Sequence, residues 1–231
     1  QMCIRDRNYN SLNRGYFPTE GVKATLGGRV TVPGSDNKYY KLSADIQGFY
    51  PLDRDHRWVI SAKASAGYAN GFGNKRLPFY QTYTAGGIGS LRGFAYGAIG
   101  PNAIYYRNDA SGRHPEWVPS TDVVGGNAIT TASAELIVPT PFVGDKGQNS
   151  VRTSLFVDAA SVWNTKWKAE DKAKFANLPD YSSPSRIRSS AGVGFQWQSP
   201  IGPLVFSYAK PIKKYEYDDV EQFQFSIGGS F

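Results

Sequence analysis

The chain has 231 residues, a formal net charge of +7 and a single cysteine, Cys3. One cysteine excludes an intrachain disulfide, and the lack of a long apolar run or of a basic segment leading into an apolar one predicts neither a transmembrane helix nor a signal peptide. The Lys and Arg residues are scattered instead of clustered, so we expect a solvated surface and no nucleic-acid partner. Aromatic residues at 14% and 25 glycines indicate a β-rich protein with many turns.

Apolar and polar residues alternate along most of the chain, which is the pattern of β-strands with one apolar face. In the first such segment, 21–32, the residues Val22, Ala24 and Leu26 alternate with polar ones. In chain order we expect a stub of a strand at 8–13 and then eight long strands. These strands are residues 21–32, 39–50, 57–68, 126–138, 150–164, 187–198, 203–210 and 222–231.

The predicted strands are long enough to cross a membrane. The segment from Trp58 to Tyr68 extends roughly 33 Å at about 3.3 Å per residue. Tilted by about 40°, it spans roughly 25 Å, which is the height of the apolar band on an outer-membrane barrel. Aromatic residues at both ends of the apolar face fit the girdles of such a barrel. The sequence therefore favours an all-β fold, an antiparallel transmembrane β-barrel of outer-membrane type, over a soluble β-sandwich.

The connections between the predicted strands differ greatly in length. Short turns at 32–37 and 199–202 alternate with longer loops near 69–122, 165–186 and 211–220. Short turns on one rim and long loops on the other are the layout of outer-membrane barrels. The longest loop far exceeds the roughly 12–15 residues beyond which loops are usually functional or disordered.

A glycine-rich stretch inside the longest loop, residues 86–101, carries one arginine, Arg92. The glycines predict a backbone that turns tightly or lies close against another surface. Alternation places Glu135 and Asp158, on consecutive strands, on the inward faces of those strands. Two inward carboxylates could hold one guanidinium. Carboxylates that are simply solvated in a polar lumen explain this pattern equally well.

The chain resembles the outer-membrane assembly factor family, the BamA-type proteins of the bacterial surface antigen superfamily. LRGF at 91–94 is similar to the loop motif of that family. The other matching stretches are RGYFPTEG (14–21), VPGSDNKYYK (32–41), PFY (78–80), AGG (85–87), VGGNA (124–128), ELIVPTPF (135–142), NSVRTSLFVDAASVWNT (149–165), PDYSSPSRIRSSAGVGFQWQSPIGPLVFSYAKP (179–211) and EQFQFSIG (221–228). In the family, the loop arginine lies inside the barrel and meets carboxylates on the two following strands. The resemblance therefore implies that Arg92, Gly93 and Phe94 fix the loop in the lumen through Glu135 and Asp158.

The same resemblance implies a sixteen-strand barrel, of which residues 8–231 supply about the second half, with 69–122 as a long lumenal loop. Residues 1–7 fit neither the alternation nor the family, and we interpret this head as a sequence artefact. Family members also carry a row of periplasmic domains and a first barrel strand, which this sequence lacks. We therefore expect a fragment that does not close into a barrel by itself.

The resemblance further implies a bacterial outer-membrane protein that folds and inserts other β-barrels. In the family, the seam between the first and last strands is a lateral gate, whose free edge pairs with an incoming strand. The last strand here is predicted at 222–231, with apolar side chains outward and two glycines that weaken pairing near its end. The expected gate residues are Gln222, Phe223, Phe225, Ile227, Gly228, Gly229 and Phe231.

The partners implied by the resemblance are nascent outer-membrane β-barrel proteins, outer-membrane lipids and accessory assembly lipoproteins bound through the periplasmic domains. Two other functions stay open, a related secretion pore that exports a partner protein and a passive porin-like barrel. His56 and His114 have no metal-ligand spacing around them, and no nucleophile and base set is evident. We therefore expect no enzymatic activity, no cofactor and no metal site.

Overall fold

A computed structural model describes residues 2–32, 34–108, 115–141, 143, 150–167, 178–200 and 202–228. The strands are β1 (Met2–Asn10), β2 (Gly21–Thr31), β3 (Tyr39–Pro51), β4 (Val59–Gly71), β5 (Asn102–Asn108), β6 (Pro115–Val123), β7 (Ala128–Val138), β8 (Val151–Trp163), β9 (Arg188–Ser199), β10 (Gly202–Lys213) and β11 (Phe223–Ile227). A single-turn 3-10 helix, η1, covers Phe79–Gln81.

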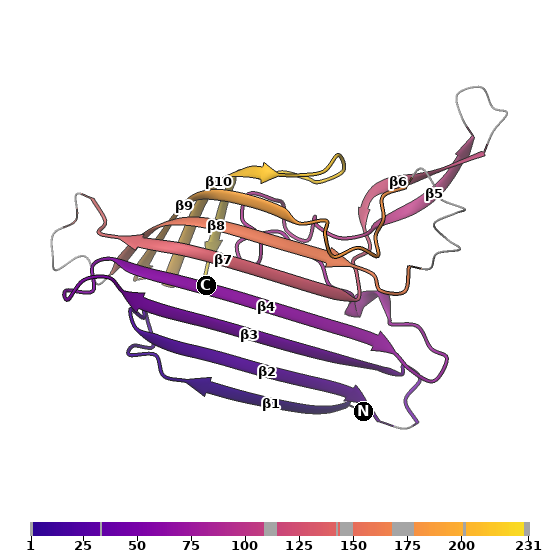
Figure 1. Cartoon of the computed structure of the whole chain (residues 1–231), viewed down its shortest axis with the longest axis horizontal. Helices are drawn as coiled ribbons and strands as arrows, with labels where there is room; N and C mark the ends of the chain where they lie inside the picture. Colours follow the sequence, from indigo (N-terminus) through magenta and orange to yellow (C-terminus); the bar gives the residue numbers. More distant parts are fainter. Residues whose placement is uncertain are drawn as a thin grey trace.

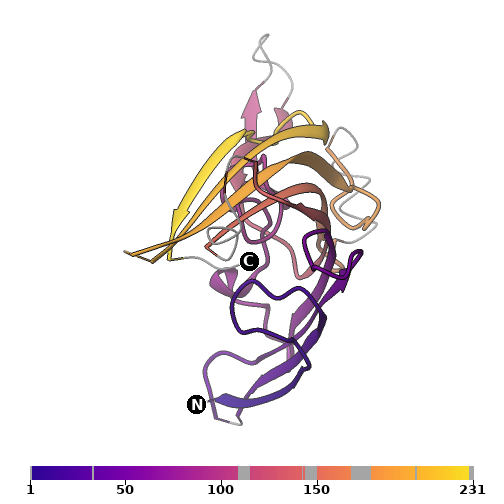
Figure 2. The same ribbon diagram turned by 90° about the vertical axis from the view of Figure 1, so that its left-hand side faces the viewer.

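Nine strands form one antiparallel sheet in the order β1-β2-β3-β4-β7-β8-β9-β10-β11. The sheet curves into a trough (Figures 1 and 2), with β1 and β11 as its two edges, and it does not close within the described residues. The expected all-β antiparallel fold is confirmed. No helix in the described part of the chain is long and apolar enough to cross a membrane.

The alternation in the sequence separates the two faces of the sheet. On the outer face, large apolar side chains remain about half exposed, such as Leu26 (58%), Ile46 (52%) and Leu155 (48%). Strand pairing aligns these positions across the sheet, so that Ile46 lies opposite Ala24 of β2 and Ala64 of β4. A continuous exposed apolar face of this kind is the lipid-facing band of a transmembrane barrel. The inner face carries polar and charged side chains together with buried apolar clusters such as Phe49, Val59 and Ile137.

The loop expected at 69–122 contains two strands that the alternation did not predict. β5 and β6 pair with each other and project as a hairpin beyond the ends of the long strands (Figure 1). Prolines at positions 115 and 119 interrupt any strand pattern in the sequence, and an isolated hairpin tolerates them because its outer backbone groups need no partner. Only the part of the loop before this hairpin lies against the inner face.

Two further expectations need correction. The short turn at 32–37 follows β2 and lies on the same rim as the long loops, because strands of an antiparallel sheet leave alternately at opposite ends. The last strand was expected at 222–231; it is described from Phe223 to Ile227, Gly228 follows with a left-handed φ of 77°, and residues 229–231 lie outside the described residues.

The head of the chain enters the sheet as part of β1, so the stub expected at 8–13 is the end of a strand that begins at Met2. Pairing with β2 places Arg7 opposite Leu26 on the outer face. It places Ile4 on the inner face, so the polarity of this first part of β1 is the reverse of that of β2, whereas Tyr9 lies opposite Ala24 on the outer face. An arginine on the lipid face near the midplane costs about 2–4 kcal/mol. That the head is a sequence artefact stays a prediction.

Candidate functional site: an arginine that fixes the lumenal loop

The loop that carries Arg92 is folded tightly against the inner wall of the sheet. Its backbone closes on itself through bridges between Ala85 and Ile99 and between Gly87 and Leu91. Gly86 has a φ of 114°, and a side chain there would collide with the carbonyl oxygen of Ala95. Glycine is therefore required at this turn.

Apolar side chains of the loop form a small core with β8. Leu91, Phe94 and Ile99 are fully buried and pack with Ala160 and Val162 of β8. Fully burying a side chain of this size contributes about 1.5–3 kcal/mol. This apolar cluster brings the neighbouring residue Arg92 to the polar part of the same wall.

Arg92 binds both inward carboxylates. Its Nε donates to Asp158 Oδ2 and its Nη2 donates to Asp158 Oδ1, each at 2.7 Å. Its Nη1 forms an ion pair with Glu135 Oε1 at 2.5 Å. The side chains of Arg92 and Asp158 are each only 3% exposed. A guanidinium has a planar fork of donors, so it can bind one carboxylate with two bonds and still reach a second.

Neighbouring groups hold the guanidinium in one orientation. Its central carbon, Cζ, lies over the Phe156 ring, 3.4 Å from the ring centre. The Ser133 hydroxyl accepts from Arg92 Nη2 at 3.1 Å and donates to Asp158 Oδ1 at 2.6 Å. The Ser190 hydroxyl of β9 donates to the Arg92 carbonyl oxygen at 2.5 Å. Three consecutive strands of the wall, β7, β8 and β9, therefore contribute to the site.

The electrostatic balance keeps Arg92 charged. Burial disfavours its charged form, but the hydrogen bonds and negative charges of Asp158 and Glu135 outweigh this effect and raise the pKa of Arg92 above its ordinary value. Removing one partner of such a buried pair typically costs about 3–5 kcal/mol, because the other charge is left without compensation. Here the loss of one guanidinium would remove the cation that both Asp158 and Glu135 bind.

The same loop also contacts the last strand. The Gln224 side chain of β11 is buried and donates from Nε2 to the Phe94 carbonyl oxygen at 2.7 Å. The Glu221 N–H donates to the Gly93 carbonyl oxygen at 3.2 Å. Gly93 has a φ of 88°, and a side chain there would come within 3.0 Å of the Ala209 side chain of β10. The arginine loop is thus joined both to the middle of the wall and to its edge.

The predicted gate residues contact β10 through their backbone, and the described apolar ones point away from the lumen. Phe223, Phe225 and Ile227 point outward and are 59, 48 and 61% exposed. Gln222 lies just before β11, and its carbonyl oxygen accepts from the Ala209 N–H at 2.8 Å. Gly228 follows β11 and donates its N–H to the Pro203 carbonyl oxygen at 2.8 Å. Gly229 and Phe231 lie outside the described residues.

Sequence reasoning missed Phe156, Ser190 and Gln224 as members of the site. Alternation places all three on inner faces, which was the available signal. Their contacts depend on the path of the loop, and strand periodicity carries no information about that path.

Comparison with known proteins identifies the family. A model of the Omp85 superfamily domain matches residues 6–231. The chain belongs to the Omp85 superfamily. The crystal structure of BamA from Haemophilus ducreyi lacking POTRA domains 1-3 matches with a TM-score of 0.90 and 59% identity, over 97% of this chain and 41% of that one.

Two relatives are described as outer membrane protein assembly factor BamA. The protein from Neisseria meningitidis serogroup B is 32% identical, over 96% of this chain and 28% of its own length. The protein from Nitratidesulfovibrio vulgaris is 27% identical, over 86% of this chain and 21% of its own length. The chain thus spans well under half the length of each of these relatives.

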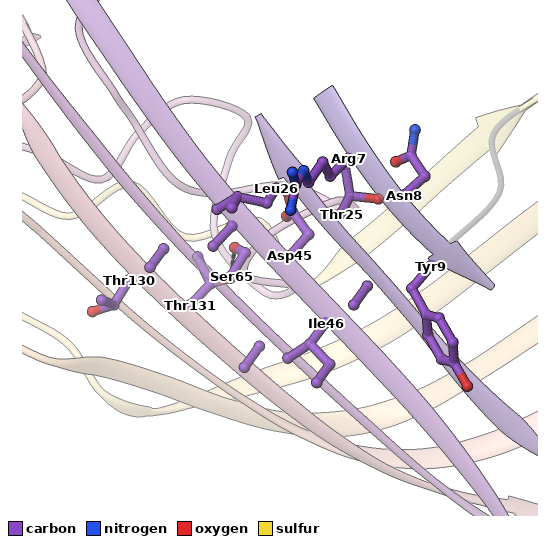
Figure 3. A pocket seen from close by; sticks show the side chains of 14 residues that line it. Arg7, Asn8, Tyr9, Thr25, Leu26, Asp45, Ile46, Ser65, Thr130 and Thr131 are labelled. Atoms are coloured by element: carbon purple, nitrogen blue, oxygen red, sulfur yellow. Dashed lines mark hydrogen bonds between the residues drawn. The ribbon is translucent and has the colours of Figure 1, made fainter. Parts of the chain in front are cut away.

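Omp85 proteins are outer-membrane proteins, so the apolar outer face contacts lipid and the inner face lines the lumen. A shallow hollow of about 750 Å³ crosses the outer face over β1 to β4 and β7 (Figure 3). Small residues such as Ala44 and Ala66 line it between the larger Leu26, Ile46 and Tyr9. Because it belongs to the lipid-facing surface, we do not regard it as part of the Arg92 site.

Proposed function

We propose that this Omp85 chain is part of an outer-membrane assembly factor that folds and inserts other β-barrel proteins. The observation that carries the proposal is the 59% identity to a solved BamA chain over 97% of the residues. The proteins matched in sequence are also named as assembly factors, which favours assembly over a secretion pore or a passive barrel.

The proposed activity is physical templating and needs neither an enzymatic step nor a cofactor. Within the described residues, β11 pairs with β10 at five positions, flanked by backbone hydrogen bonds at Gln222 and Gly228, whereas β9 pairs with β10 along almost their full lengths. A short edge strand leaves backbone N–H and C=O groups free to pair with an incoming strand. Nascent outer-membrane β-barrel proteins are the proposed substrates.

The Arg92 site supports this activity by setting the position of the loop that contacts β11. We propose that outer-membrane lipids surround the apolar face and that accessory lipoproteins bind periplasmic domains of the longer protein. In this arrangement the loop is held in one position and contacts both the middle strands of the sheet, β7 to β9, and the edge strand β11.

The test is insertion of a model β-barrel protein into liposomes that contain the full-length protein. Arg92→Ala should lower the insertion rate roughly tenfold or more, because a loss of about 3–5 kcal/mol at a buried ion pair releases the loop. Arg76→Ala is the matched control, because Arg76 is an exposed arginine of the same long connection. Equal insertion by Arg92→Ala and Arg76→Ala, with both proteins folded, would contradict the role given to the site.

A further inference from the structure

A second buried ion pair lies at the opposite end of the last hairpin from Gly228. Arg188, the first residue of β9, binds Asp218 in the loop 214–222 that joins β10 to β11. Arg188 Nη2 donates to Asp218 Oδ1 at 2.9 Å, and Nε lies 3.1 and 3.2 Å from the two carboxylate oxygens. The two side chains are 3 and 4% exposed.

The same carboxylate also shapes the loop. The Tyr215 N–H donates to Asp218 Oδ2 at 2.7 Å, and the Asp218 N–H donates to the Tyr215 carbonyl oxygen at 3.1 Å. The guanidinium carbons of Arg186 and Arg188 lie 4.1 and 4.7 Å from the centre of the Tyr215 ring. One acidic residue therefore ties a compact turn to a cationic and aromatic cluster at the start of β9.

The remainder of this loop touches the arginine loop. The Ala95 N–H donates to the Asp219 carbonyl oxygen at 3.1 Å, and Val220 packs on the core formed by Leu91 and Phe94. The chain then passes directly into β11, which begins at Phe223. The loop 214–222 thus lies between two buried ion pairs, at Arg92 and at Arg188.

We propose that Arg188 and Asp218 form a second lock, which fixes the outer end of β11 as a pivot. With this end held, β11 separates from β10 starting at its opposite end, near Gly228, where the bond from the Gly228 N–H to the Pro203 carbonyl oxygen is the last described contact between the two chain segments. A role for this pivot in opening a lateral gate rests on the proposed assembly function, but the pivot itself is a property of the fold. Arg188 and Asp218 act through the loop and touch no substrate, so both are positioning residues.

Hydrogen exchange measured by mass spectrometry on the full-length protein in lipid nanodiscs tests the lock. In Asp218→Asn, the amides of Tyr215, Ala95 and Glu221 and those of β11 should exchange roughly 10- to 100-fold faster, as expected for loss of charge-assisted hydrogen bonds. Glu216→Gln is the matched control, because it removes an exposed acidic charge from the same loop and should leave exchange unchanged.

Coupling is measured by adding Arg188→Gln and the double variant. A true pair gives a double variant whose exchange resembles that of either single variant, whereas independent effects multiply. Arg188→Lys, which keeps the charge but loses the two-bond fork, should give an intermediate effect and serves if Asp218→Asn does not fold. Faster exchange confined to 215–218, with β11 and Ala95 unchanged, would overturn the pivot. Failure of the wild-type protein to insert substrates would instead overturn the proposed function and leave these exchange results intact.

Discussion

At the scale of single residues, the position of the arginine loop depends on one guanidinium and one glycine. Arg92 binds Asp158 and Glu135, and the next residue, Gly93, has a backbone conformation that L side chains rarely adopt. Its φ is 88°, at a point where the chain passes within van der Waals distance of Ala209. Side-chain chemistry and backbone conformation are therefore both needed at adjacent positions.

Gly93→Ala should destabilise the folded protein by about 1–3 kcal/mol, because a side chain at this φ is strained and meets Ala209. The midpoint of urea unfolding in lipid vesicles, followed by tryptophan fluorescence, measures the effect on the full-length protein. Gly89→Ala is the matched control, since Gly89 lies in the same loop and has no neighbouring atom within 4 Å of an added Cβ. If both variants unfold at the same urea concentration, the close approach of the loop to β10 does not contribute to stability.

Alternation along the strands is enough to place Glu135 and Asp158 on one face. The arginine that binds them, Arg92, comes from the LRGF motif of the loop. Alternation puts Ser190 and Gln224 on inner faces as well, but it does not predict that they bind the loop. Their partners are backbone carbonyl oxygens of that loop. The direction in which a glycine-rich segment turns depends on tertiary contacts, which strand periodicity does not encode.

At the scale of elements, the edge strand differs from its neighbours in how it ends. β11 has five residues where β8 has 13 and β10 has 12. Gly228 follows it with a left-handed φ, and among the described residues no atom lies within 4 Å of a Cβ added there. The end of β11 is thus set by backbone conformation and not by packing.

Gly228→Val should favour an extended backbone, lengthen the pairing of β11 with β10 and slow substrate insertion by about tenfold, since β-branched residues disfavour positive φ. Insertion of a model barrel by the full-length protein in liposomes is the measurement. Gly202→Val is the control, because Gly202 also has a positive φ and open space around it but is the first residue of β10, next to the turn from β9. Equal rates for wild type and Gly228→Val would show that the end of β11 does not limit insertion.

The long strands were predictable because their apolar face meets lipid and leaves a period of two in the sequence. The hairpin of β5 and β6 was not predictable, because it forms a separate two-stranded sheet and has no continuous apolar face that would produce an alternating pattern. The bend that follows Ile227 was not predictable either, because alternation does not report the left-handed φ of Gly228.

At the scale of the whole molecule, the sheet is a wall with two different environments. Its outer face carries small and medium apolar side chains across β2, β3, β4, β7 and β8, and its inner face carries the ion pairs that fix the loops. Neighbouring residues of one strand therefore face lipid and lumen in turn. The same substitution at adjacent positions should have very different consequences.

Ala64→Arg and Ser65→Arg make this comparison at the middle of β4. Ala64 lies on the outer face opposite Ile46 and Ala132, so an arginine there faces lipid and should cost about 2–4 kcal/mol. Ser65 lies on the inner face directly opposite Asp45, which can pair with the new charge, so the cost should be well below that of Ala64→Arg. Urea unfolding of the full-length protein in lipid vesicles measures both. Equal destabilisation by the two variants would show that the face assigned to lipid is wrong.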